Sequence, residues 1–144
     1  MSLWILDTDS VSLLLEGNPL VAKQAAAKFS DVAITIITVQ EIFNGWAGRI
    51  NDPSQTSRLV WLYTKLWQTT TFFKKVTILN FTEDAQACRD HLLVQNKFLA
   101  KKRLDKDTRI AAIAIVNQAI LVTRNYKDFS LVPGLPIEDW AKPG

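Results

Sequence analysis

The chain has 144 residues, a length typical of one domain with a substantial buried core. It is 48% hydrophobic and 22% charged, a balance that excludes a disordered chain. A single cysteine excludes an internal disulfide, and no apolar run is long enough for a membrane span or a signal peptide. The net charge of +3 permits a nucleic-acid partner without requiring one. We therefore expect a cytoplasmic protein with one domain, residues 1–144.

Strands are expected to alternate with helices along the whole chain. Short apolar or β-branched runs predict strands over 3–6, 32–37, 76–79 and 119–122, with an edge strand over 135–137. Helical patterns predict helices after an N-cap at Ser10, over 20–29, after a capping box formed by Thr38 and Glu41, over 53–73, over 82–98, and from Asp107 onward. This alternation predicts an α/β/α sandwich around a mostly parallel sheet of about four to five strands.

Acidic and polar side chains follow several of these strands. Asp7 ends the first strand, Glu41 lies in the first turn after the second, and Asn125 and Asp128 follow the fourth. Asp107 opens the helix that leads into the fourth strand and continues its sheet-facing side. Because the carboxyl ends of parallel strands meet at one edge of the sheet, where ligands bind, we expect these residues to converge there.

Several carboxylates in one pocket cannot all stay ionised without a cation. Oxygen ligands without a matching set of His or Cys favour a hard ion, Mg²⁺ or Mn²⁺. Such an ion lowers the pKa of a bound water and neutralises a phosphodiester, so the pattern predicts metal-assisted hydrolysis of a nucleic-acid strand. We expect the remaining phosphates to contact the nearby basic side chains, which are Lys101, Lys102, Arg103, Lys106, Arg109 and Arg124.

Each acid also has a purely structural interpretation. Asp7 fits a turn after a strand, and Asp107 fits a helix N-cap. Glu41 fits the acidic member of a capping box. Asp9 is best interpreted as a favourable charge at a helix N-terminus, with a supporting role at the site left open. The functional interpretation depends on the joint placement of these residues.

Four motifs in order resemble the PIN-domain family, and more closely its VapC-type toxin branch. The motifs run from the first strand almost to the end of the chain. They are residues 6–9 (LDTD), 38–42 (TVQEI) with Gly45, 107–112 (DTRIAA), and 121–125 (LVTRN) with 128–129 (DF), 132–135 (VPGL) and 137–140 (IEDW).

The resemblance implies a Mg²⁺- or Mn²⁺-dependent endoribonuclease that is the toxin of a toxin–antitoxin pair, forms a homodimer and is blocked by a cognate antitoxin. Asp7, Glu41 and Asp107 match the metal-site acids of that family. The fourth acid is open, because Asn125 stands where many members have Asp, and Asp128 is the alternative. Thr8 and Thr123 match supporting hydroxyls. The RNA itself, whether tRNA, rRNA or mRNA, is not specified by the sequence.

Two other functions remain open at this stage. The first motif also resembles the start of haloacid dehalogenases, where Asp7 would be a phosphorylated nucleophile and Asp9 its acid/base. Alternatively, the chain is a non-catalytic RNA- or antitoxin-binding module, which Asn125 favours. Since the resemblance implies an antitoxin, the two helices that carry Phe43, Trp46, Trp61 and Leu62 are expected to form a groove for an antitoxin segment.

Overall fold

Five parallel strands form the centre of the structure, a computed structural model that describes residues 2–143. Their spatial order is β3 (Thr77–Leu79), β2 (Val32–Thr35), β1 (Trp4–Leu6), β4 (Ile120–Val122) and β5 (Ile137–Glu138). Every pairing is parallel. The predicted α/β fold is therefore confirmed, with all rather than most of the strands parallel. Residues 1 and 144, at the ends of the predicted domain, lie outside the described residues.

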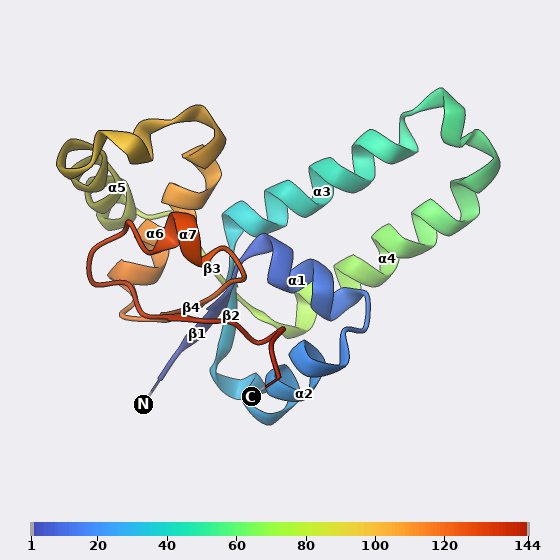
Figure 1. Cartoon of the computed structure of the whole chain (residues 1–144). Coiled ribbons are helices and arrows are strands. Elements are labelled where there is room, and N and C mark those ends of the chain that lie inside the picture. The colour runs from blue at the N-terminus through green and yellow to red at the C-terminus, as the bar shows by residue number, and fades with distance from the viewer. Residues whose placement is uncertain (1, 144) are drawn as a thin grey trace.

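Helices cover both faces of this sheet (Figure 1). Helices α5 and α6 lie on one side, whereas α3 and α4 extend together away from the sheet. The helices are α1 (Thr8–Leu15), α2 (Pro19–Ala27), α3 (Ile36–Ile50), α4 (Leu59–Lys75), α5 (Glu83–Gln95), α6 (Asp105–Val116) and α7 (Tyr126–Phe129). Short 3₁₀ segments lie at Phe29–Asp31, Pro53–Arg58, Lys97–Ala100 and Lys102–Leu104.

The strand alternation divides the core into two clusters, one on each face of the sheet. Ile5 and Leu121 pack with the small-residue side of α6 and with α5. Their neighbours Leu6 and Val122 point to the other face and pack against α1 and α2. All four side chains are fully buried. Burial on both faces explains why the strands are short and continuously apolar.

Helices α1 and α3 begin earlier than the sequence pattern predicts. The N-cap of α1 is Asp7, not Ser10, because the Asp7 carboxylate accepts a hydrogen bond from the Ser10 backbone N–H. The N-cap of α3 is Thr35, whose hydroxyl accepts from the backbone N–H of Thr38. The predicted capping box of Thr38 and Glu41 is therefore wrong, and β2 ends at Thr35 instead of residue 37.

Other boundaries also differ. Helix α6 begins at Asp105 rather than Asp107, and α5 ends at Gln95 instead of near residue 98. Pro53 begins a 3₁₀ segment, and the α-helix that follows begins at Leu59. A glycine within a helix, such as Gly45 in α3, would suggest that another backbone segment lies close to it. An added Cβ at Gly45 would meet nothing within 4 Å, so the structure shows no such close approach.

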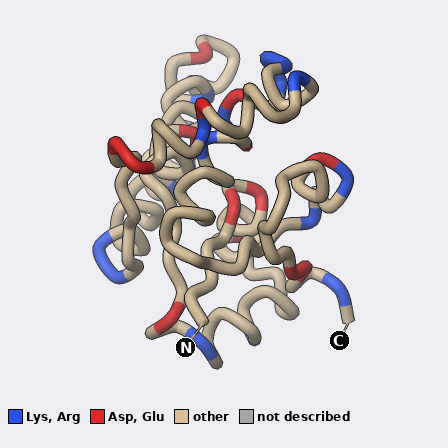
Figure 2. Tube along the Cα trace, turned by 90° about the vertical axis from the view of Figure 1, so that its left-hand side faces the viewer, with Lys and Arg blue, Asp and Glu red and all other residues tan. Residues whose placement is uncertain are grey.

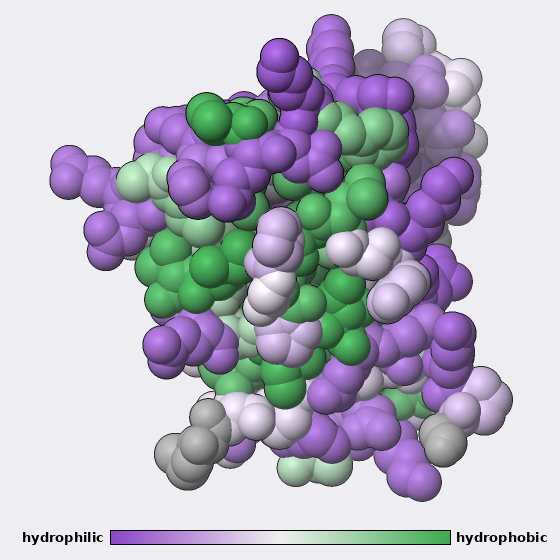
Figure 3. Space-filling view, turned by 60° about the vertical axis from the view of Figure 1, so that its left-hand side comes forward, coloured by the Kyte–Doolittle hydropathy of each residue, from purple (hydrophilic) through white to green (hydrophobic). Residues whose placement is uncertain are grey.

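The surface is mainly hydrophilic with local apolar areas. On the face seen in Figure 3, a central group of apolar side chains is surrounded by hydrophilic ones. The large apolar side chains most exposed on α4 are Val60 and Trp67, at 85% and 68%. Among residues 2–143, every helix is too short or too polar to cross a lipid bilayer.

Candidate functional site

A polar cleft lies where β1 and β2 pass into their following helices. It has a volume of about 580 Å³. The structure brings together at this cleft most of the residues predicted to form the site. Those that line it are Asp7, Thr8, Asp9, Glu41, Asp107, Arg124 and Asn125.

Asp7 is fixed by its neighbours on both sides. Its side chain is only 6% exposed. One carboxylate oxygen accepts from the Ser10 N–H at 2.8 Å, and the other accepts from the Thr123 hydroxyl at 2.6 Å. Burial raises the pKa of Asp7 above its ordinary value, and these hydrogen bonds act in the opposite direction. The carboxylate thus has a fixed orientation and is almost completely shielded from solvent.

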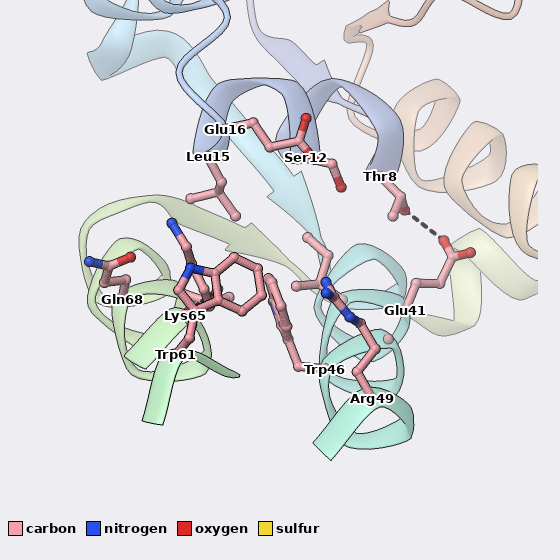
Figure 4. Close-up of a pocket in the computed structure, with 13 residues that line it drawn as sticks. Thr8, Ser12, Leu15, Glu16, Glu41, Trp46, Arg49, Trp61, Lys65 and Gln68 are labelled. Carbon is pink, nitrogen blue, oxygen red and sulfur yellow. Dashed lines mark hydrogen bonds between the residues drawn. The ribbon is translucent and has the colours of Figure 1, made fainter. Parts of the chain in front are cut away.

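Glu41 approaches the same cleft from α3. Its carboxylate accepts a 2.6 Å hydrogen bond from the hydroxyl of Thr8, which immediately follows Asp7 (Figure 4). The Thr8 hydroxyl also lies 3.0 Å from that of Thr38, which is fully buried. Thr8 therefore links the start of α1 to α3, and the hydroxyl of Thr38 belongs to this linkage rather than to a helix cap.

Asp107 completes the acidic lining from the first turn of α6. Its pKa is raised to about 6, first by burial and then by the negative charges of Asp7 and Glu41, with a further contribution from Asp128. Asp7, Glu41 and Asp107 line the same cleft, so their negative charges repel one another. A cation would relieve this repulsion.

Asp9 lies at the mouth of the cleft in an ion pair with Arg124. The guanidinium donates hydrogen bonds of 2.7 and 3.0 Å to the two carboxylate oxygens. The side chains of Arg124 and Asp9 remain 51% and 49% exposed. Asp9 lies in the first turn of α1, as predicted for a charge at a helix N-terminus, and Arg124 is one of the predicted phosphate contacts.

The two candidates for the fourth acidic position are hydrogen-bonded to each other. Asn125 lines the cleft, and its amide donates to Asp128 at 3.0 Å. Arg103 also donates to Asp128, at 2.9 and 3.2 Å. These bonds, first that from Arg103 and then that from Asn125, lower the pKa of Asp128. Asp128 is not among the cleft-lining residues, whereas Asn125 is.

The basic side chains predicted to contact RNA are dispersed. Figure 2 shows Lys and Arg in several separate parts of the chain rather than in one stripe. Lys101 and Lys102 are exposed, and Lys106 approaches Gln40 at 3.5 Å. Arg109 instead pairs with Asp105 at 2.8 Å, and Asp105 also accepts from Arg89 at 2.6 Å. Asp105 thus joins α5 to α6 and does not line the cleft.

A second groove, of about 560 Å³, continues from the cleft between α1, α3 and α4 (Figure 4). Thr8 and Glu41 line both hollows. Of the aromatic and aliphatic anchors predicted for a groove, Trp46 and Trp61 line it. Leu62 is fully buried in the core instead, and Phe43 packs on Phe73 with ring centroids 5.5 Å apart.

The donor chemistry fits a hard divalent ion. Asp7, Glu41 and Asp107 offer only oxygen atoms, with the amide of Asn125 and the hydroxyl of Thr8 beside them. Within residues 2–143, no group of three Asp, Glu, His or Cys side chains is arranged closely enough to coordinate a metal ion by itself. An ion at this cleft would therefore keep several waters, as Mg²⁺ does in proteins.

Arg49 and Lys65 are groove residues that the sequence analysis did not identify. Arg49 lies four and eight residues after Gly45 and Glu41, so helical spacing alone could have placed it on the same stripe. No comparable signal identified Lys65, because α4 becomes a neighbour of α3 only in the folded chain.

Comparison with known proteins supports the fold and extends over almost the whole chain. No protein-family model and no curated protein sequence matches. A chain in the DNA-bound VapBC structure from Salmonella typhimurium has a TM-score of 0.76 at 22% identity, covering 97% of this chain and 99% of that one. A chain of FitAB bound to an IR36 DNA fragment has a TM-score of 0.73 at 22% identity, covering 99% of this chain and 98% of that one. A chain of a toxin–antitoxin complex from Klebsiella pneumoniae has a TM-score of 0.67 at 24% identity, covering 94% of this chain and 96% of that one. The resemblance inferred from the four motifs is confirmed at the level of the fold.

Proposed function

We propose that this chain is the toxin of a toxin–antitoxin pair and acts as a Mg²⁺- or Mn²⁺-dependent endoribonuclease in the cytoplasm. The observation that carries the proposal is the cleft shared by Asp7, Glu41 and Asp107, in which burial and then the charges of Asp7 and Glu41 raise the pKa of Asp107 to about 6. The similarity in fold to solved toxin–antitoxin complexes supports the biological context.

Asp7 and Asp107 would hold the ion, with Glu41 beside them. When bound, the ion would activate a water and offset the negative charge that develops on the scissile phosphate. Thr123 and Ser10 hold Asp7 in one orientation, and Thr8 does the same for Glu41. Such prior orientation lowers the cost of assembling the site when RNA arrives.

Glu41 would orient or deprotonate the attacking water, since one of its oxygens is engaged by Thr8 and the other is not hydrogen-bonded within residues 2–143. Asn125 has no charge, so it would orient a water or a phosphate oxygen through its amide. Lys101, Lys102 and Lys106 would contact phosphates further along the strand.

A phosphatase mechanism with Asp7 as nucleophile and Asp9 as acid/base is less well supported. Both carboxylate oxygens of Asp9 accept hydrogen bonds from Arg124, so neither is free to exchange a proton with a substrate. Hydrolysis of an aryl phosphate by the purified chain, lost in Asp9→Asn, would favour that mechanism over the nuclease.

The proposal includes a cognate antitoxin and a homodimer, both implied by the sequence resemblance. Co-expression of the cognate antitoxin is expected to restore growth, and the antitoxin is expected to co-purify with the chain. The mass of the purified chain in solution is expected to be about twice the 16.2 kDa of one chain. A monomer at micromolar concentration contradicts the dimer only.

Expression of the full chain in bacteria without a partner tests the toxin and nuclease functions together. We expect growth arrest and new RNA ends on sequencing, both absent in Asp7→Asn. A matched control is Asp90→Asn, which removes an exposed carboxylate on α5 away from the cleft. Growth arrest and RNA ends that persist in a folded Asp7→Asn protein would contradict the proposal. Growth arrest without new RNA ends would favour a non-catalytic binding module.

A further inference from the structure

The arginines assigned to RNA from the sequence already have carboxylate partners. Each forms an ion pair of 2.7 to 2.9 Å: Arg103 with Asp128, Arg109 with Asp105, and Arg124 with Asp9. An RNA phosphate at any of them would have to displace an internal partner or share the cation with it. These three side chains therefore offer less free positive charge than the sequence suggests.

The groove beside the cleft contains cations of a different kind. Arg49 and Lys65 line it, and neither has a carboxylate within 4.0 Å among residues 2–143. Both lie against tryptophan rings instead. Arg49 is 5.1 and 5.2 Å from the ring centres of Trp46 and Trp61, and Lys65 is 5.6 Å from that of Trp61. Arg58 lies over the Trp61 ring at 4.4 Å.

The groove runs directly into the acidic cleft. Thr8 and Glu41 belong to both linings, so the two hollows share a wall. Along α3, the residues Glu41, Gly45 and Arg49 recur every four positions and mark one stripe. Arg49 lies eight positions after Glu41, which corresponds to about 12 Å along the helix. Gly45 leaves this stripe open, since nothing approaches its Cβ position within 4 Å.

We propose that this groove binds a single-stranded stretch of the RNA whose scissile phosphate lies in the cleft. The inference rests on the proposed nuclease function and adds the path of the substrate. Arg49 and Lys65 would hold phosphates, and a base would stack on Trp61 or on a guanidinium that itself lies on the ring. A span of 12 Å accommodates about three stacked nucleotides.

The lining favours RNA over the antitoxin segment that the sequence pattern suggested. Two of the four predicted protein anchors, Leu62 and Phe43, are not available in the groove. The remaining two, Trp46 and Trp61, are partly covered by cations. Unpaired cations over aromatic rings are the combination that binds single strands without sequence preference. The acids of the lining are Glu41, at the cleft, and Glu16 on the α1 side (Figure 4).

Binding can be measured without cleavage. The full chain in EDTA is titrated against a fluorescein-labelled, mixed-sequence single-stranded RNA of about twelve nucleotides, and anisotropy gives the Kd. We expect Trp61→Ala to weaken binding about tenfold. We expect the double variant Arg49→Gln/Lys65→Gln to reduce the slope of log K against log salt by about 1.4, the value for two phosphate contacts on a single strand.

Matched controls lie on the same helix but outside the groove. Trp67 is two residues after Lys65, so it faces the opposite side of α4 and is 68% exposed. Lys74 is in the last turn of α4 and does not line the groove. Trp67→Ala and Lys74→Gln are expected to bind the RNA as the unaltered chain does.

An unchanged Kd and salt slope in the groove variants would overturn the inference. It would also be overturned if the groove variants kept RNA binding but lost the co-expressed antitoxin, a result that would assign the groove to protein. Neither outcome bears on the nuclease itself, which is tested by cleavage at the acidic cleft. Conversely, RNA binding that depends on the groove in a chain that cleaves nothing would support the binding site and contradict the enzyme.

Discussion

Arg103 and Asp128 are joined by two hydrogen bonds of 2.9 and 3.2 Å, so that the last acid of the predicted set is held in an ion pair beside the cleft. The Arg103 side chain is 54% exposed, whereas that of Asp128 is 11% exposed. Asn125 donates to the same carboxylate and itself lines the cleft. In this arrangement Asp128 supports Asn125 and influences Asp107 through its charge.

Replacement of Asp128 by Asn tests that supporting role. Because Asp128 does not line the cleft, we expect RNA cleavage by Asp128→Asn to fall by no more than about tenfold, the lower end for residues that support a ligand. Initial rates on one RNA, compared with those of Asp7→Asn and Arg103→Gln, provide the measurement. A loss as complete as that of Asp7→Asn would assign Asp128 to the ligands.

The hydrogen bond from Thr123 to Asp7 is expected to contribute to stability as well as to orientation. Thr123→Val removes a donor to a buried carboxylate and should lower the free energy of unfolding by about 2 kcal/mol. Thr123→Ser keeps the hydroxyl and should lose much less. Urea unfolding at neutral pH measures both, and equal stability of the Val variant and the unaltered chain would contradict this role for the bond.

Asp107 makes stability depend on pH in a defined direction. Its pKa is raised to about 6 by burial and then by the charges of Asp7 and Glu41. The folded protein therefore binds this proton more tightly than the unfolded chain, and the free energy of unfolding falls as pH rises from about 4 to above 6. In EDTA, Tm should be higher at about pH 5 than at about pH 7.5, with a smaller difference in Asp107→Asn. The same difference in both proteins would contradict the assignment.

Asp105 and Asp107 are two residues apart and are expected to behave differently. Asp105 pairs with Arg89 and Arg109 and lies outside the cleft. We expect Asp105→Asn to lose about 1 kcal/mol of stability while it keeps cleavage, because these ion pairs are partly exposed to solvent. Asp107→Asn should lose cleavage without a loss of stability. Loss of cleavage in a stable Asp105→Asn protein would move the site acid to that position.

The sheet was predictable because each strand has a local sequence signal. Trp4–Leu6 and Ile120–Val122 are short apolar runs, and such runs are buried on both faces of a parallel sheet. The approach of Asp7 to Asn125 follows from that topology, since the ends of neighbouring parallel strands share an edge. To predict that the acids gather at one cleft, it was thus enough to know the order of the strands and helices.

The hydrogen bonds within the site were not predictable in the same way. Thr35 and Thr38 are equally suitable N-caps, and the apparent capping box favoured the wrong one. Glu41 binds Thr8 across 33 positions, and Arg103 binds Asp128 across 25. Neither pair has a local signal, because each depends on how two helices pack after the sheet has formed. The positions of helix starts were therefore the main errors, and the ion pairs of the site were not predicted at all.

The most direct test of the central claim is RNA cleavage by the purified chain with Mn²⁺ or Mg²⁺ and with EDTA, in the unaltered protein, Asp107→Asn and Asp105→Asn. Labelled RNA is followed on denaturing gels under identical conditions. Cleavage that requires the ion, persists in Asp105→Asn and disappears in a folded Asp107→Asn protein is the predicted result. Cleavage that is unaffected by EDTA or retained in full by Asp107→Asn would contradict a metal-dependent site built on these carboxylates.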